Sequence, residues 1–260
     1  MKILKLAALV ILLYNPVSTM AWGVNGHRIT GQIAENHMTP KARAAVKAIL
    51  GESIAMAGNW ADFAKSDKAY DYLYNWHFVE TDKFYPYPEL VQYFKRDTAV
   101  NAYTKFNFLK AELKKKTLSK DNKLLYLRLL IHLEEDLHQP LHTGHDGDKG
   151  GNSIKLKWFG KDTNLHTIWD SELIEFQQLS YTEYVAAIDV STTSQRLAWQ
   201  KAPVTQWVYE SNQLAQNIYA KTKPDASLSY NYNYDFIKTL NKRLLMGGIR
   251  LAGVLNELFG

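Results

Sequence analysis

The sequence predicts an all-α fold: a single compact domain of many helices, with one or two short β-strands. Three observations lead to this. Several segments repeat apolar residues at steps of three and four, prolines and glycines fall at the ends of those segments, and only one short segment alternates in polarity. Residues 22–260 are long enough to form one large domain.

The early helices are predicted from their end signals. Thr39 is a favourable N-cap, Pro40 occupies the first helical position, and the apolar stripe over Lys41–Leu50 stops at Gly51. Asn101–Lys116 has the same spacing of apolar residues and is predicted to be the next long helix.

The middle of the chain is predicted to hold a buried helix followed by irregular structure. Leu124–Leu137 is almost entirely apolar, and Pro140 should stop its helix because proline lacks the N–H and its ring clashes inside a helix. A glycine-rich loop over 143–153 and a strand over Ile154–Phe159 should follow, while Tyr85–Pro88 reads as a loop. Three further helices are expected at His166–Phe176, Val204–Lys221 and Tyr234–Phe259.

The first 21 residues have the composition of a secretory signal peptide. Lys2 and Lys5 precede the apolar run Leu6–Tyr14, and a polar stretch ends in the small residues of Ser18–Ala21. A permanent membrane anchor is the alternative, but the run is well below the ~18–20 apolar residues needed to span a bilayer. We therefore expect cleavage after residue 21, a mature chain that begins at Trp22, and no membrane association.

The composition limits the chemistry that an exported chain can use. There is no cysteine, so disulfides are excluded and a metal site must use nitrogen and oxygen ligands. The absence of Asn-x-Ser/Thr sites, with export, favours a bacterial periplasmic or secreted protein. The formal net charge of +5 permits a polyanionic partner without requiring one.

Two histidine–aspartate pairs share a helical spacing. His132 and Asp136 lie one turn apart on the predicted buried helix, and His166 and Asp170 repeat the spacing on another helix. One pair alone is explained equally well by a hydrogen-bonded pair in the core, since buried charges are usually paired. Two pairs, together with His142 just after the proline break, predict ligands for more than one zinc ion.

Three more candidates lie nearer the amino terminus. Asp62 follows Trp60 and His77 follows Trp76, which suggests polar side chains set in apolar walls. Each is also compatible with an ordinary half-buried residue, and His27 by itself would indicate only the start of a helix.

Taken in order, these residues resemble one enzyme family, the zinc-dependent single-strand nucleases of the S1/P1 type, which occur in fungi, plants and bacteria. A lone His-x3-Asp motif is nonspecific, but the ordered set is specific. The matching segments are Trp22-Gly-Val-Asn-Gly-His27, Trp60-Ala-Asp62, Trp76-His77-Phe78, His132-x3-Asp136-x5-His142, Gly150-Gly151-Asn152 and His166-x2-Trp169-Asp170.

The resemblance implies a cluster of three zinc ions per chain. The implied ligands are Asp62, His77 and His132 for the first ion; His142, His166 and Asp170 for the second; the α-amino nitrogen and carbonyl oxygen of Trp22 with His27 for the third; and Asp136 shared by the first and third. A free amine and its own carbonyl form a five-membered chelate that an internal peptide nitrogen cannot supply. Cleavage before Trp22 would therefore complete the site.

The resemblance also implies the reaction. A hydroxide between paired zincs would attack the phosphorus of single-stranded DNA or RNA and leave 5′-phosphorylated products, with 3′-nucleotidase activity as a further expectation. The expected substrates are nucleic acids and nucleotides, and the expected oligomeric state is a monomer.

Residues around the metals are assigned by the same resemblance. Asp62 and Lys65 are the expected catalytic residues, with Lys65 contacting phosphate, Phe78 stacking on a base, Glu80 hydrogen bonding to that base, and Asn152 lining the same cleft. Fungal members more often have Arg and Asp where this chain has Lys65 and Glu80, and lysine lacks the bidentate geometry of arginine. A solvated lysine and a core phenylalanine are the simpler alternatives at these positions.

Two other functions stay open from the sequence. Zinc-dependent bacterial phospholipases C share the terminal tryptophan and most of the ligand pattern, but their last ligand resembles Glu where this chain has Asp170. A non-catalytic periplasmic protein that binds zinc or nucleic acid would use the same ligands with closed coordination, whereas catalytic zinc keeps an open position.

Overall fold

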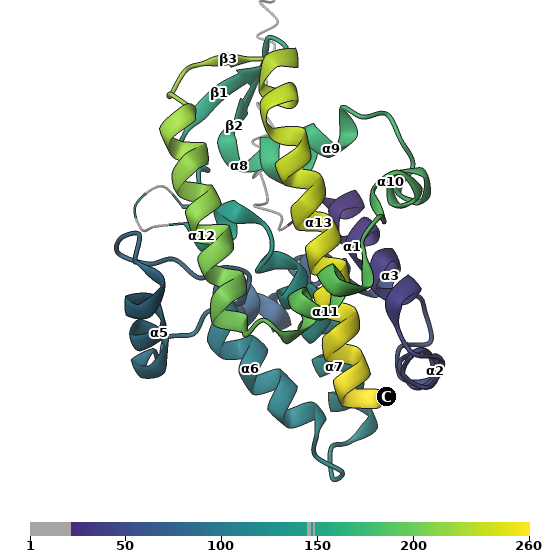
Figure 1. Ribbon diagram of the computed structural model, residues 1–260. Coiled ribbons are helices and arrows are strands. Elements are labelled where there is room, and N and C mark those ends of the chain that lie inside the picture. The colour runs from purple at the N-terminus through teal and green to yellow at the C-terminus, as the bar shows by residue number, and fades with distance from the viewer. Residues whose placement is uncertain (1–21, 145–146, 148) are drawn as a thin grey trace, which may run out of the picture.

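Two long helices, α12 (Val204–Lys221) and α13 (Tyr230–Phe259), run in opposite directions along one side of the molecule (Figure 1). They are joined through Glu210 of α12, which forms ion pairs with Arg243 and Arg250 of α13 at 3.0 and 2.8 Å. The structure, a computed structural model, describes residues 22–144, 147 and 149–260. The predicted signal peptide, residues 1–21, lies outside the described residues.

The rest of the described chain is mostly helical, as the sequence predicts. In chain order the remaining elements are α1 (Val24–His37), α2 (Pro40–Leu50), α3 (Ile54–Ala57), α4 (Trp60–Ala64), the 3₁₀ helix η1 (Lys68–Trp76), α5 (Tyr87–Arg96), α6 (Ala102–Leu113), α7 (Lys120–Asp136), the 3₁₀ helix η2 (Pro140–Thr143), β1 (Lys155–Trp158), β2 (Lys161–Asn164), α8 (Leu165–Thr167), the π-helical turn η3 (Ile168–Glu172), α9 (Leu173–Glu175), α10 (Tyr181–Ile188), α11 (Thr193–Lys201) and β3 (Ser227–Leu228).

The predicted end signals operate as expected in α2. The Thr39 side chain accepts a hydrogen bond from the Ala42 N–H, and Gly51 closes the helix with a φ of 71°. A β-carbon disfavours that left-handed conformation, so glycine is favoured there. The buried helix α7 begins four residues earlier than predicted, because the Ser119 hydroxyl caps it by accepting from the Asn122 N–H.

The small sheet has three strands, where the sequence predicts one or two. β1 lies between β2, which is antiparallel to it, and β3, which is parallel and contributes only Ser227 and Leu228. Two residues are too few to show an alternating pattern, so the sequence carries no signal for this strand.

Two of the segments assigned from the sequence differ in type from the structure. Tyr85–Pro88 is not only a loop, because Pro86 is the N-cap of α5 and Pro88 lies within its first turn, where a missing N–H costs nothing. The predicted helix His166–Phe176 is interrupted by η3, whose wider turns are typical of functional sites.

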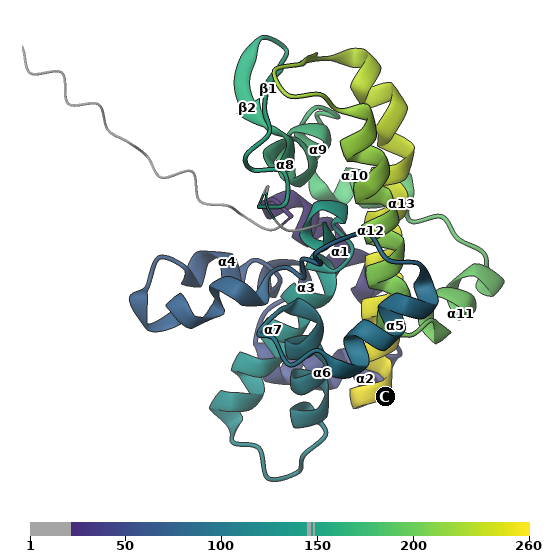
Figure 2. The same ribbon diagram turned by 90° about the vertical axis from the view of Figure 1, so that its left-hand side faces the viewer.

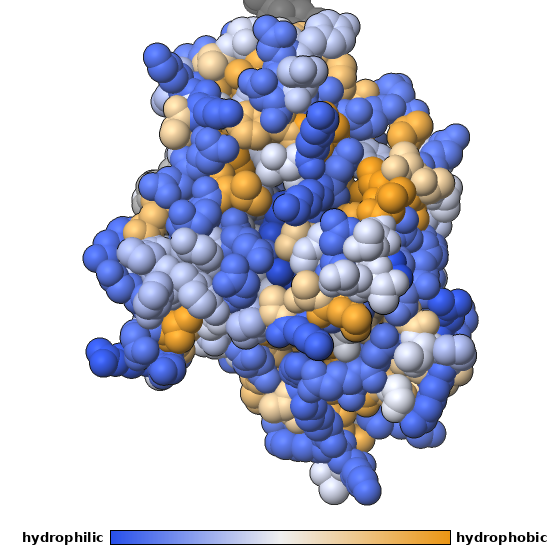
Figure 3. Space-filling model, in the orientation of Figure 1, coloured by the Kyte–Doolittle hydropathy of each residue, from blue (hydrophilic) through white to orange (hydrophobic). Residues whose placement is uncertain are grey.

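The core consists of two apolar clusters. One surrounds α2, α6 and α7, and the other joins the sheet to α1, α9 and α13. Figure 2 shows α4 projecting to one side of this body, and the face covered by α12 and α13 is mostly hydrophilic with small separate apolar patches (Figure 3). Among the described residues, no helix combines the length and the apolar character that a membrane span requires.

Candidate metal centre

The eight predicted ligand side chains meet in one region, although they come from six different elements and the residues next to them. Within each of three groups, one ligand atom from each residue lies within 4.8 Å of the others. The groups are His27, Asp62 and His132; His77, His132 and Asp136; and His142, His166 and Asp170.

Asp136 stands between two of these groups. Its Oδ2 lies 3.1 Å from Nε2 of His132 and 3.3 Å from Nδ1 of His77, whereas its Oδ1 lies 3.7 Å from Nε2 of His27. His132 and Asp136 are fully buried one turn apart at the end of α7. The two carboxylate oxygens therefore face different imidazoles, as a shared ligand requires.

Asp62 of α4 completes this side of the cluster. Its Oδ2 lies 3.7 Å from Nε2 of His27, and its Oδ1 lies 3.9 Å from both His77 and His132. Lys65, three residues later, donates to the same Oδ1 at 2.7 Å. A cation is thereby held at the edge of the cluster.

The third group, His142, His166 and Asp170, comes from elements that follow the end of α7. Nε2 of His166 is 3.0 Å from Oδ2 of Asp170, and Nε2 of His142 is 3.8 Å from Oδ1. The Gln139 side chain donates to that Oδ1 at 2.6 Å and accepts from the Leu141 N–H at 2.5 Å. One amide thus fixes both the carboxylate and the start of η2.

The histidine rings are oriented by hydrogen bonds behind them. Three imidazoles donate from Nδ1 to a backbone carbonyl: His132 to Gly58 at 2.6 Å, His142 to His77 at 2.8 Å, and His166 to Gly150 at 2.7 Å. Nδ1 of His27 meets the buried carboxylate of Glu135 at 2.5 Å. Such contacts fix the tautomer and leave Nε2 as the ligand atom.

Several of the inward atoms have no hydrogen-bond partner among the described residues. They are Nε2 of His27, Oδ2 of Asp62, Oδ1 of Asp136 and Nε2 of His142. Buried polar atoms are nearly always paired in folded proteins, so this many orphans in one place call for a bound ion. Imidazole nitrogens and carboxylate oxygens are the donor set that zinc accepts, so the residues present fit the metal.

The protonation of the cluster follows from its burial. Burial, with the charges of neighbouring histidines, holds the pKa values of His27, His77 and His142 well below the usual range, so these rings are neutral. Burial also raises the pKa of Asp136 and of Asp170 to about 6, although His132 and His166 oppose the rise. A dication would favour both ionised carboxylates.

Trp22 lies beside the cluster and is fully buried. Its indole Nε1 donates to the carbonyl of Glu135 at 2.9 Å, and the next residue, Gly23, donates from its N–H to the carbonyl of Asp170 at 2.8 Å. A β-carbon on Gly26 would lie 2.9 Å from that of Trp22, so glycine lets the indole pack closely. The first described residue is thus fixed between two ligand-bearing elements.

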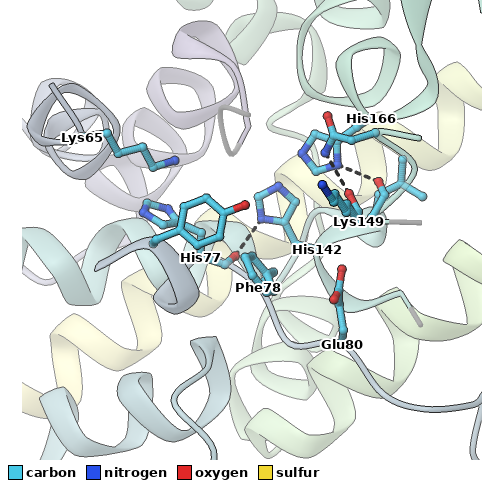
Figure 4. A pocket seen from close by; sticks show the side chains of 11 residues that line it. Lys65, His77, Phe78, Glu80, His142, Lys149 and His166 are labelled. Atoms are coloured by element: carbon cyan, nitrogen blue, oxygen red, sulfur yellow. Dashed lines mark hydrogen bonds between the residues drawn. The ribbon is translucent and has the colours of Figure 1, made fainter. Parts of the chain in front are cut away.

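A pocket opens onto the cluster, with Lys65, Phe78, Glu80 and Asn152 among its lining residues (Figure 4). Phe78 is partly exposed rather than a core residue. The Asn152 amide donates to the backbone carbonyl of Lys149 at 2.8 Å, which the sequence reasoning did not anticipate.

Further lining and supporting residues were missed in the sequence. Tyr74 and Lys149 also line the pocket, and Glu135, Gln139 and Gly58 position ligands. Of these, only Glu135 could have been noticed in the sequence, as a charged residue within an apolar helix. A backbone carbonyl or the shape of the pocket is not revealed by the residue type.

Comparison with known proteins identifies the family. The S1/P1 nuclease family matches residues 22–260. Endonuclease 3 of Arabidopsis thaliana is 32% identical over 92% of this chain and 90% of its own length, and Nuclease P1 of Penicillium citrinum is 28% identical over 92% of this chain and 98% of its own length. S1/P1 nucleases are zinc-dependent, in agreement with the buried His/Asp groups. The chain belongs to the S1/P1 nuclease family and is a hydrolase of phosphoric ester bonds that acts on nucleic acid.

Proposed function

We propose that this protein is an exported nuclease that holds three zinc ions and cuts single-stranded DNA and RNA to 5′-phosphorylated products. The observation that carries the proposal is Asp136, whose two oxygens face different histidines in a cluster with unpartnered inward atoms among the described residues. The proposed ligands are Asp62, His77 and His132; His142, His166 and Asp170; and the Trp22 amine and carbonyl with His27, with Asp136 shared between the first and third ions.

The bound zinc ions would polarise a phosphoryl oxygen and make water a nucleophile at neutral pH. The side chains and backbone of the protein shield the site and orient its ligands. The buried walls exclude bulk solvent, and the backbone carbonyls behind His132, His142 and His166 hold their rings in one orientation. These imidazoles do not reorganise as charge develops on phosphate, which is the condition for electrostatic stabilisation of a transition state.

The pocket residues orient the substrate in this proposal. Nζ of Lys65 lies 2.7 Å from Asp62 at the cluster edge, where it can contact a phosphate oxygen. The Phe78 ring is held edge-on by Tyr74, with 6.0 Å between ring centroids, and offers a face to a base. Glu80 lines the same pocket and can accept from that base. A base reaches this pocket only when it is unpaired, which supports a preference for single strands.

Export and oligomeric state belong to the same proposal. We propose that residues 1–21 are removed as a signal peptide, that the mature chain acts in the periplasm or outside the cell, and that it is a monomer. Mononucleotides with a 3′-phosphate are a further proposed substrate, since the proposed base contacts Phe78 and Glu80 line the same pocket as the histidines of the cluster.

The test is metal analysis of the mature protein together with digestion of single-stranded DNA and RNA. Three zinc ions per chain and 5′-phosphate ends are expected. Alanine at His77 or His142 should remove zinc and activity, whereas His37→Ala is a matched control because His37 pairs with Asp189 outside the cluster. Unchanged zinc content and hydrolysis in His142→Ala would overturn the ligand assignment.

Phosphatidylcholine provides the comparison for the phospholipase alternative. The family match and the nuclease relatives favour nucleic acid, so no lipid turnover is expected. Lipid hydrolysis without cleavage of nucleic acid would overturn the proposed substrate. Full zinc loading without any hydrolysis would favour the non-catalytic alternative.

A further inference from the structure

A band of aromatic side chains reaches the surface beside the metal cleft. It comes from three elements, η1, α6 and α7, and we call it the aromatic band: Tyr70, Tyr72, Trp76, Phe108 and Tyr126. Tyr72 is 52% exposed and Phe108 is 42% exposed, far more than rings that serve packing alone, such as Phe106 at 0%. The proposed function uses none of these five residues.

Direct ring contacts make the band continuous. The centroids of Tyr72 and Trp76 are 5.7 Å apart in an edge-on arrangement, those of Tyr70 and Tyr72 are 6.4 Å apart, and those of Phe108 and Tyr126 are 6.0 Å apart. Lys105 connects the two halves, because its Nζ lies 4.8 Å from the Trp76 ring centre and 5.6 Å from that of Phe108. These contacts hold the rings in place: Trp76 is buried, Tyr70 and Tyr126 are partly buried, and Tyr72 and Phe108 remain exposed.

The band continues from the proposed substrate pocket. Trp76 directly precedes His77, and the Phe78 carbonyl accepts from the Ala102 N–H at 2.9 Å, which fixes the start of α6 against the pocket wall. Lys105 lies one turn further along α6. Tyr74, on the same 3₁₀ helix as Tyr72, lines the pocket itself. A chain leaving the pocket on this side therefore meets the band next.

Rings interleaved with a cation fit one kind of partner. Unpaired bases stack on aromatic faces whatever their sequence, and a lysine between the rings attracts the phosphates that join them. Duplex nucleic acid cannot use such a surface because its bases are stacked on one another. Lys105 also lies over two of the rings, so the cation is held where a sugar–phosphate backbone crossing the band would pass.

We propose that the aromatic band binds the unpaired nucleotides that flank the bond being cut, by stacking their bases on Tyr72 and Phe108. This inference rests on the proposed function, because it extends the binding of the same single-stranded substrate. It makes the enzyme prefer longer strands: the band adds affinity for an oligonucleotide and none for a dinucleotide, which is too short to leave the pocket.

The test compares KM for three substrates: a dinucleotide, the same dinucleotide extended by about ten thymidines, and the same dinucleotide extended by about ten abasic sugar–phosphates. The tail length is within the ~4–16 nucleotides that known single-strand-binding folds cover. For the unaltered enzyme the thymidine tail should lower KM, and the abasic tail, which keeps the charge but has no bases, should lower it much less. Tails on either side of the scissile bond should be tried.

The doubly substituted variant Y72A/F108A should lose the benefit of the thymidine tail. Its KM for the tailed strand should rise about fivefold or more, and its kcat should not change. A rise of about fivefold corresponds to the smallest effect expected when one stacked base loses its ring. Turnover of the dinucleotide should stay the same, which also shows that the variant is folded. Tyr72→Phe keeps the ring and should behave as the unaltered enzyme. Tyr234→Ala, which removes a ring that is 82% exposed on α13, is the matched control.

Each other outcome contradicts a specific part of the argument. An abasic tail that lowers KM as much as the thymidine tail would show that charge, not stacking, holds the strand. Unchanged KM in Y72A/F108A, or equal losses on the tailed strand and the dinucleotide, would overturn the role of the band. If the unaltered enzyme cleaves neither nucleic-acid substrate, the proposed function itself is wrong.

Discussion

Oε2 of Glu135 lies 2.5 Å from Nδ1 of His27 in a hydrogen bond that is fully buried. Glu135 precedes Asp136, yet the two carboxylates serve different purposes in the proposed site. Asp136 faces the cluster, whereas Glu135 stands behind His27 and sets the direction of its Nε2. The neighbouring Trp22 indole donates to the Glu135 backbone, so this residue joins the start of the described chain to the end of α7.

Removing this carboxylate should weaken metal binding at the His27 side of the cluster. Without Glu135 the imidazole can tilt, and loss of such an outer partner typically costs about 10–100-fold in metal affinity or activity. Glu135→Ala should therefore lose about one zinc per chain on dialysis at limiting zinc, while Glu135→Gln, whose amide oxygen can still accept from Nδ1, should retain more. Equal zinc contents in the unaltered protein and Glu135→Ala would contradict the role of Glu135.

Gly58 should also affect metal binding, because it lies against the Glu135 carboxylate that orients His27. A β-carbon at this position would lie 2.6 Å from Oε2 of Glu135, and the Gly58 carbonyl accepts from Nδ1 of His132. Gly58→Ala is expected to displace the carboxylate, to lower zinc affinity at the His27 side of the cluster, and to reduce kcat about tenfold, the lower end of the cost of losing such a supporting contact. Gly253→Ala is a suitable control, because the atoms nearest to its added β-carbon belong to the side chain of Gln200, which is not one of the proposed ligands. Comparable effects of the two substitutions would argue against the mechanism.

Gln139 should control the other end of the cluster. Its amide donates to Asp170 at 2.6 Å while its oxygen accepts from the Leu141 N–H, so Gln139→Leu removes both bonds at similar volume. The zinc ion proposed for His142, His166 and Asp170 should be lost first, with the others retained, and activity should fall about 10–100-fold. Zinc titration monitored by calorimetry should show one weakened site. Uniform weakening of every site would not fit this prediction.

Local spacing in the sequence determines much of the placement of the proposed ligands. His132 and Asp136 share a face of a regular helix, so their juxtaposition follows from helix geometry alone. Nε2 of His166 and Oδ2 of Asp170 also lie 3.0 Å apart, although the helix between them contains a π turn that the sequence does not predict. The approach of Asp62 depends on tertiary packing, and only the family resemblance suggested it.

The supporting contacts could not be predicted in the same way. Carbonyl groups behind the imidazoles belong to the backbone, which is identical at every residue, so the roles of Gly58 and Gly150 have no sequence signature. The strand β3 is two residues long and pairs in parallel with β1 across about seventy residues of sequence, a contact set by the return of α13 rather than by local preference.

The Glu210 ion pairs should make stability depend on acid pH. Burial raises the pKa of Glu210, but hydrogen bonds and charges from Arg250 and Arg243 outweigh it and hold the pKa below the usual 4.5. The stabilisation is therefore fully present above the unfolded value of 4.5 and is lost as the pH falls through the lower folded value.

Glu210→Gln should accordingly reduce the free energy of unfolding at pH 7 by about 2 kcal/mol, less than for a fully buried pair because Glu210 is partly exposed. The difference from the unaltered protein should shrink towards pH 3, as measured by urea denaturation. Glu257→Gln is the matched control: its partners Lys110 and Lys114 are at the surface, so a change below about 0.5 kcal/mol is expected. A loss for Glu210→Gln that is equal at both pH values would contradict the linkage.

The amino terminus provides the most specific prediction. If the Trp22 amine is a zinc ligand, a chain that retains residues 1–21, or carries one extra residue before Trp22, has a peptide nitrogen there and should lose one zinc and most activity. Trp22→Phe in the mature chain keeps the amine and carbonyl but loses the indole bond to Glu135, so it should keep that zinc even if it is less stable. This pair of variants separates the chelating backbone from the buried ring. Full zinc content in the extended chain, or loss of zinc in Trp22→Phe alone, would assign the contribution of Trp22 to its packing and not to its amine.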